Sequence, residues 1–276
     1  MRTLLALSVL AAALAPACTP KESTTPSLVS HESWCPDGFE VGPQDTCFAI
    51  PDKHDASTPV LVYLHGMYAG HGSVEEWSLV RSAVDRGFAV VVPRGKRGMC
   101  AWKAELKDHF CWPQEADDPE AFKHVVAEWD RVLWQVDALL EAGTHKRYVL
   151  GFSNGGFFAT YLAVHGLFPA QGYAIVNGGS LEPTIKPAKV PLLLVAAQDD
   201  ADQAPKMKAF HEALGAAPHA YCTRPGSHPL AASDVEAALR FFRHAEGKAP
   251  PFACEAGGKP APAPPPPTGP YAPSGL

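Results

Sequence analysis

An alternation of short apolar segments with longer amphipathic ones constrains the fold more than any other feature of the sequence. The apolar segments are rich in β-branched residues, which is typical of strands covered on both faces. They span residues 59–64, 88–92, 148–150, 173–176, 190–197 and 220–223. The amphipathic segments predict helices at 73–86, between Asp118 and Gly143, and at 154–165, 204–214 and 231–243. This order predicts an α/β fold with a mostly parallel central sheet and helices on both faces.

The first 17 residues have the pattern of a signal peptide. Arg2 supplies a positive charge, residues 4–14 form an apolar run of 11 residues, and residues 15–17 are small enough for cleavage. Such a run is too short to span a bilayer as a helix, so we expect export. Cleavage after residue 17 would give a secreted protein. A lipoprotein peptidase would instead leave Cys18 lipidated, followed by a polar tether over 18–34, and place the protein in a bacterial cell envelope, at the outer membrane or periplasmic face.

Cysteine parity favours the lipid anchor. The chain has seven cysteines, and lipidation of Cys18 leaves an even number for an oxidising compartment. The sequence cannot fix their pairing, but the shortest loops favour Cys35–Cys47 and Cys100–Cys111, which leaves Cys222–Cys254. A zinc site is the weaker alternative because no C-x-x-C spacing occurs, so no metal is expected.

The remaining chain divides into one domain and a tail. Residues 257–276 are so rich in proline that we expect a disordered, polyproline-type tail. Residues 35–256 are long enough for a single domain with a full core. The net charge of −6 argues against nucleic acid or anionic lipid as the partner.

A G-x-S-x-G motif lies between a predicted strand and a predicted helix, at residues 151–155. In this setting a strained turn exposes the serine hydroxyl, and the glycines avoid clashes. Ser153 is therefore the candidate nucleophile. A glycine-rich loop with an incidental serine is the alternative.

The loop after the first buried strand, with sequence His65-Gly66-Met67, can turn backbone N–H groups towards this serine. We expect the amides of Met67 and Asn154 to form an oxyanion hole. His65 itself is expected to be a structural hydrogen-bonding residue rather than a base.

A triad also needs an acid and a base that follow the nucleophile in the chain. Asp200, after the 190–197 strand, is the favoured acid, and Asp199 is the next choice. His228 is the favoured base because it lies in a glycine-started loop between the last strand and the last helix, and His219 is the alternative.

The segment RYVLGFSNGG at 147–156 is similar to the nucleophile segment of the polyhydroxybutyrate depolymerase and feruloyl esterase branch of the α/β-hydrolases. LVYLHG at 61–66, RGFAVVVP at 86–93 and the long helix before the motif fit the same branch, so the resemblance covers about residues 60–242. It implies the α/β-hydrolase fold and hydrolysis of small or polymeric carboxylic esters through an acyl-enzyme on Ser153. The chain departs from this branch at residues 198–200, which lack the glycine commonly found before the acid.

The sequence says less about the substrate than about the reaction. Trp102 and Trp112 lie in a segment that a Cys100–Cys111 bridge would stiffen, and either ring could stack on an acyl group or simply pack on the domain. Two other functions remain open: a prolyl-oligopeptidase-like peptidase, and a surface-binding protein without catalysis. No organic cofactor is implied.

Overall fold

The computed structural model describes residues 33–70, 72–100, 103–113, 119–141, 145–182, 188–215, 217–245, 252 and 254. These residues belong to one compact unit that begins at Ser33. The predicted signal peptide, Cys18, the proline-rich tail and Trp102 lie outside the described residues.

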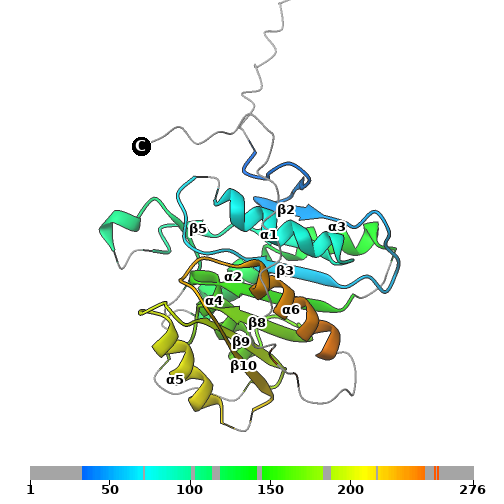
Figure 1. Ribbon diagram of the computed structural model, residues 1–276. Helices are drawn as coiled ribbons and strands as arrows, with labels where there is room; N and C mark the ends of the chain where they lie inside the picture. The colour runs from blue at the N-terminus through cyan, green and yellow to red at the C-terminus, as the bar shows by residue number, and fades with distance from the viewer. Residues whose placement is uncertain are drawn as a thin grey trace, which may run out of the picture. The chain divides into compact units, whose positions relative to one another are not determined.

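A central sheet of eight strands forms the core (Figure 1). In spatial order the strands are β1 (Glu40–Gly42), β2 (Thr46–Ala49), β4 (Ala89–Pro93), β3 (Val60–Leu64), β7 (Arg147–Phe152), β8 (Gly172–Val176), β9 (Leu192–Ala197) and β10 (His219–Arg224). The strands from β4 to β10 run parallel, whereas β1 and β2 are antiparallel to their neighbours. The predicted mostly parallel sheet is therefore confirmed, and the carboxyl ends of its parallel strands share one edge.

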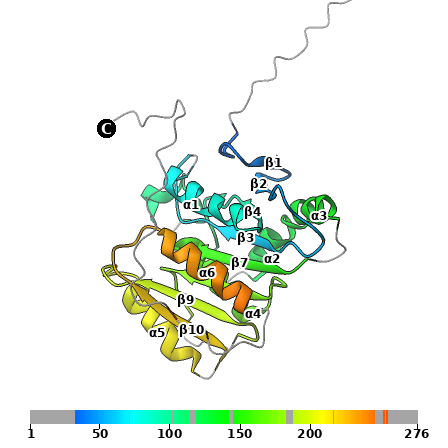
Figure 2. The ribbon, with the colours of Figure 1, turned by 45° about the vertical axis from the view of Figure 1, so that its right-hand side comes forward.

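Helices cover both faces of this sheet (Figures 1 and 2). They are α1 (Val74–Asp85), α2 (Pro119–Ala127), α3 (Asp130–Leu139), α4 (Asn154–His165), α5 (Ala204–Leu214) and α6 (Ala232–Ala245). Buried residues of α1 and α6 pack in one apolar cluster, and those of α2, α3, α4 and α5 pack in another. A layer of helices on each face of the sheet is the arrangement that the alternating sequence predicts.

The single long helix expected between Asp118 and Gly143 is wrong, because the structure has two helices there. The chain leaves the helical pattern at Glu128 and Trp129, where the amide of Trp129 donates to the Val126 carbonyl instead of continuing the ladder. The apolar spacing did not reveal this break because α2 and α3 bury their apolar side chains in the same cluster. Spacing reports which face is buried, not whether the backbone ladder is continuous.

Several short elements escaped the sequence analysis. These are β1, β2, a two-stranded ribbon of β5 (Lys96–Arg97) and β6 (Phe110–Cys111), and the 3₁₀ turn η1 (Ala104–Leu106). Trp34, the last residue of the predicted tether, is also part of the fold. It is only 5% exposed and packs against Tyr68 and Trp77, so the folded domain includes this residue.

The structure contains the two disulfides that short loop closure favoured and the third that this choice left. Cys35–Cys47, Cys100–Cys111 and Cys222–Cys254 have Cα–Cα separations of 5.5, 5.8 and 5.6 Å. Disulfides persist in oxidising compartments, so they indicate a protein that functions outside the cytosol. Within the described ranges, no helix is long and apolar enough to cross a membrane.

Candidate active site

Ser153 occupies a strained turn between β7 and α4. Its backbone has φ 52° and ψ −117°, a conformation that residues with a Cβ rarely adopt. The turn is held by a hydrogen bond of 2.9 Å from the Ser153 amide to the Val176 carbonyl on β8. The serine is thereby fixed at the carboxyl edge of the sheet.

The glycines around Ser153 are required by close backbone contacts. A Cβ on Gly151 would overlap the carbonyl of Gly155, and a Cβ on Gly155 would overlap the carbonyls of Leu64 and His65. The first residues of α4 therefore pack directly on the end of β3. This is the physical reason for the G-x-S-x-G spacing here.

A chain of hydrogen bonds joins the three predicted triad residues. His228 Nε2 lies 2.8 Å from Ser153 Oγ, and His228 Nδ1 lies 2.5 Å from Asp200 Oδ2. A carboxylate can only accept, so Nδ1 carries the proton and Nε2 is free to accept the serine hydroxyl. The three residues are far apart in sequence and come from the loops after β7, β9 and β10.

The two neighbouring aspartates have different partners. Asp199 Oδ2 accepts the Gly226 amide at 3.1 Å, so this carboxylate braces the loop that carries His228. Asp200 faces the imidazole and also accepts the amides of Asp202 and Gln203 through Oδ1. Burial alone would raise the pKa of Asp200, but these hydrogen bonds, led by that of His228, outweigh it and hold the pKa below its usual value.

The alternative base, His219, lies elsewhere. It begins β10, at the amino edge of the sheet, and its Nε2 is 2.7 Å from His211 Nδ1. The structure thus brings His228, and not His219, to the serine.

The two segments that carry the amides expected to form an oxyanion hole lie beside the serine. Asn154 is the first residue of α4, and a Cβ on Gly66 would lie 3.5 Å from Ser153 Cβ, which places the Met67 loop against Ser153. In the described part of the chain, neither the Met67 nor the Asn154 amide has a hydrogen-bond acceptor. Two free N–H groups next to a serine hydroxyl are suited to bind a developing oxyanion.

His65, at the start of this loop, is held by two hydrogen bonds of its ring. It is 3% exposed, its Nε2 accepts the Gly95 amide at 2.9 Å, and its Nδ1 lies 2.5 Å from the Gly66 carbonyl. Burial lowers the pKa of His65 to about 3, so the ring stays neutral and keeps both hydrogen bonds.

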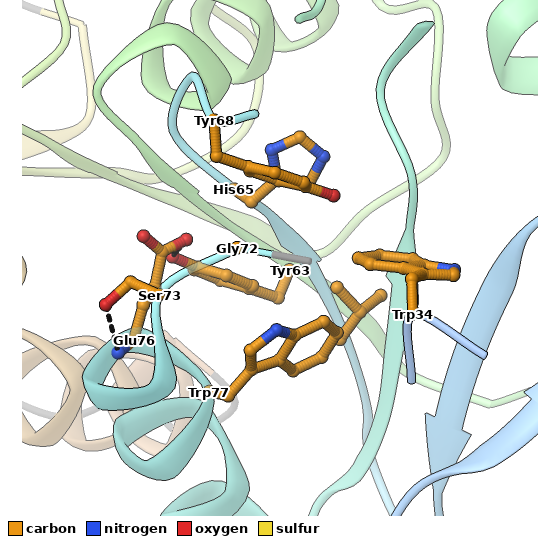
Figure 3. A pocket seen from close by; sticks show the side chains of 9 residues that line it. Trp34, Tyr63, His65, Tyr68, Gly72, Ser73, Glu76 and Trp77 are labelled. Atoms are coloured by element: carbon orange, nitrogen blue, oxygen red, sulfur yellow. Dashed lines mark hydrogen bonds between the residues drawn. The ribbon is translucent and has the colours of Figure 1, made fainter. Parts of the chain in front are cut away.

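A small cavity lies beneath the same loop (Figure 3). The Tyr63 hydroxyl donates to Glu76 Oε1 at 2.6 Å on one side of it, and Trp34 and Trp77 form the other side. Burial raises the pKa of Glu76. The half-buried Glu76 and its tyrosine partner therefore link α1 to the strand that precedes the Met67 loop.

Trp112 has a role that the sequence analysis did not predict. Its ring is fully buried and stacks on Phe158 at 5.3 Å, so it offers no open face on which a substrate could stack. Its amide donates to Asn154 Oδ1 at 2.7 Å, and its Nε1 donates to the His65 carbonyl at 2.9 Å. Trp112 thus joins the Met67 loop to the start of α4.

Asn177, at the end of β8, is a second residue that the sequence analysis missed. It has φ 45°, its Nδ2 donates to the His228 carbonyl at 2.6 Å, and its Oδ1 accepts the Ala197 amide at 2.8 Å. An asparagine followed by two glycines is a turn signal, because asparagine tolerates positive φ. That signal could have placed Asn177 at a turn, but not against His228.

Comparisons with known proteins agree with this architecture. The fold is that of the α/β-hydrolases. A carboxylesterase from Bacillus cereus has 19% sequence identity and a TM-score of 0.54 over 72% of this chain and 93% of its own. Esterase PE8 has 18% identity and a TM-score of 0.53 over 74% and 97% of the two chains. YahD, solved with malic acid, has 16% identity and a TM-score of 0.53 over 73% and 98%.

These likenesses are at low identity and support the α/β-hydrolase fold, not the narrower depolymerase and feruloyl esterase branch. No protein-family model matches the chain, and no curated protein matches it. Among the described residues, no group of three or more His, Cys, Asp or Glu side chains could hold a metal ion.

Proposed function

We propose that the protein is an exported serine hydrolase that cleaves carboxylic esters through an acyl-enzyme on Ser153. The observation that carries this proposal is the hydrogen-bonded chain from Ser153 through His228 to Asp200 at the carboxyl edge of the sheet. The order of the three residues in the chain is the one used by α/β-hydrolases.

The proposed reaction begins with proton transfer. His228 Nε2 takes the proton of Ser153 while Oγ attacks the ester carbonyl carbon. Asp200 keeps the imidazole in the required tautomer and stabilises the imidazolium that forms. The amides of Met67 and Asn154 donate to the oxyanion, where loss of one donor typically costs about 10²–10³ in rate.

Collapse of the tetrahedral intermediate completes acylation. The bond between the carbonyl carbon and the alkoxy oxygen breaks, and His228 gives its proton to the departing alcohol. A water molecule, deprotonated by the same histidine, then attacks the acyl-enzyme and releases the acid. Ser153 and His228 return to their starting protonation states.

For the substrate we propose polyesters or aryl esters such as feruloyl esters. This choice rests on the resemblance of residues 147–156 to that branch. The exported location rests on the signal-peptide pattern and the three disulfides, and the lipid anchor on Cys18 rests on cysteine parity.

The direct test is labelling with a fluorophosphonate probe, followed by a panel of ester and amide substrates. Wild type should be labelled and hydrolyse esters, while Ser153→Ala should lose both activities. A folded wild type that takes no label would favour a binding protein on this fold, and faster cleavage of prolyl amides than of esters would favour a peptidase. Palmitate labelling of wild type beside Cys18→Ala tests the anchor separately.

A further inference from the structure

The loop that carries His228 is held by three hydrogen bonds from one side chain. Arg224, the last residue of β10, donates from Nη1 to the carbonyls of Pro225 and Ser227 at 3.1 and 3.2 Å. Its Nη2 donates to the carbonyl of Pro229 at 2.6 Å. The guanidinium therefore binds the main chain on both sides of His228.

A buried carboxylate orients this guanidinium. Asp234, in the first turn of α6, is fully buried, and its Oδ1 accepts Arg224 Nε at 2.6 Å. Its Oδ2 accepts the Ala231 amide at 2.9 Å, so both oxygens are occupied. The Arg224 side chain itself is only 11% exposed, and its carbonyl accepts the Gln198 amide at 2.8 Å.

The geometry uses features that only arginine has. The three nitrogens of the planar guanidinium, Nε, Nη1 and Nη2, all donate, to one carboxylate and three carbonyls. A lysine has the charge but not the fixed fork of donors.

We propose that Arg224, oriented by Asp234, is the positioning residue of His228, which holds the loop so that the imidazole reaches Ser153 and Asp200 together. This inference rests on the proposed hydrolase function and adds a residue to its machinery that does not touch the substrate. Misplacement of a catalytic group by about 1 Å can cost about 10²-fold in rate. A variant whose His228 loop is not bound by Arg224 should therefore have a lower kcat and a nearly unchanged KM.

The test is the double variant Arg224→Met/Asp234→Asn, which removes the clamp without leaving a buried charge unpaired. Its matched control is Arg147→Met/Asp137→Asn, which removes another partly buried pair, 2.6 Å apart, at the start of β7 and so at the amino edge of the sheet. We expect kcat and the rate of fluorophosphonate labelling to fall together by about 10²-fold in the clamp variant, with KM nearly unchanged. The control should keep kcat, with a similar loss of melting temperature.

A spectroscopic readout separates this inference from the proposed function. The Nδ1 proton of His228, hydrogen-bonded to Asp200, should give a low-field imidazole resonance in wild type that is absent from His228→Ala. It should disappear or move in the clamp variant and persist in the control, whether or not any tested ester is a substrate. A clamp variant that keeps this resonance and keeps kcat overturns the inference, and so does a loss of kcat that merely follows the unfolded fraction.

A wild type that is inert towards every ester and the probe would instead refute the proposed function, and the resonance would still decide on Arg224. Should the double variant fail to fold, Arg224→Lys provides the same measurements because it leaves Asp234 with a charged partner. A normal kcat and an unchanged His228 resonance in Arg224→Lys would overturn the need for the arginine fork.

Discussion

The strained backbone of Ser153 predicts that the fold would be more stable with a residue that lacks a Cβ at this position. Replacing Ser153 by Ala or by Gly removes the same hydroxyl and the same 2.8 Å hydrogen bond to His228. The two variants differ only in the Cβ, which is the atom that makes φ 52° and ψ −117° costly. We therefore expect Ser153→Gly to be more stable than Ser153→Ala.

The magnitude follows from two opposing effects. Holding a residue in such a conformation costs about 1–3 kcal/mol. The greater freedom of glycine in the unfolded chain takes back about 0.4–1 kcal/mol. The net gain should be about 1 kcal/mol, or a rise of about 2–4 °C in melting temperature for a domain of this size.

The assay is thermal and urea unfolding of both variants with the disulfides intact. Ser82, in the interior of α1, provides the control. There Gly should be less stable than Ala by about 1 kcal/mol, because a helix favours alanine. If Ser153→Gly is no more stable than Ser153→Ala while the Ser82 pair behaves as expected, the Cβ is not strained and the reasoning about the turn is refuted.

Three further predictions concern acids and one buried imidazole. Asp200→Asn should lower kcat by up to ~10⁴-fold because it disturbs the imidazole tautomer. Asp199→Asn should retain most of the wild-type kcat because its side-chain oxygen can still accept the Gly226 amide. Steady-state kinetics of both variants will show whether the two aspartates differ. Because burial holds the pKa of His65 at about 3, the unfolded chain binds a proton below pH 6.5 that the folded chain does not. The free energy of unfolding should therefore fall from pH 6.5 towards 3, and urea titrations of His65→Gln should show a shallower fall. Because burial raises the pKa of Glu76 above 4.5, the protonated carboxyl stabilises the fold below that pH, and this contribution is lost as the pH rises through the folded-state pKa. The free energy of unfolding of Glu76→Gln, compared with that of wild type, should therefore be higher at pH 7 than at pH 4. An equal difference between the two proteins at both pH values would contradict this.

The parts of the fold that could be predicted are those whose local signals agree with their packing. Helix α4 and helix α5 have the predicted bounds, and each is followed by a glycine, at residue 166 or 215, that marks its end. The helix predicted at 73–86 is α1, and Ser73 caps it because its side chain accepts the Glu76 amide. Strands β1 and β2 could not be predicted because they have only three and four residues, and β1 exposes Val41.

The limits at the candidate site have a different cause. The motif pointed to Ser153 as the candidate nucleophile, and chain order limited the candidates for the base and the acid. Position after the strand favoured Asp200, but it left the adjacent Asp199 open. The directions in which these two side chains point depend on the backbone turn after β9. Only the structure shows that the Gly226 amide donates to Asp199. Arg224 and Asn177 were missed for a related reason. Both bind main-chain carbonyls of the loop that carries His228. Every residue has such a carbonyl, so the sequence does not indicate which one a side chain will bind.

The disulfides connect the compartment of the protein to the geometry of the site. Cys111 directly precedes Trp112, whose amide and indole N–H bind Asn154 and the His65 carbonyl. The bridge from Cys222 ties the edge strand β10 two residues before Arg224, where the His228 loop begins. Reduction would free both segments at points that support the free amides or the imidazole, while the core of the sheet, built from apolar side chains, would keep its packing. The site should therefore depend on an oxidising environment more steeply than the fold does.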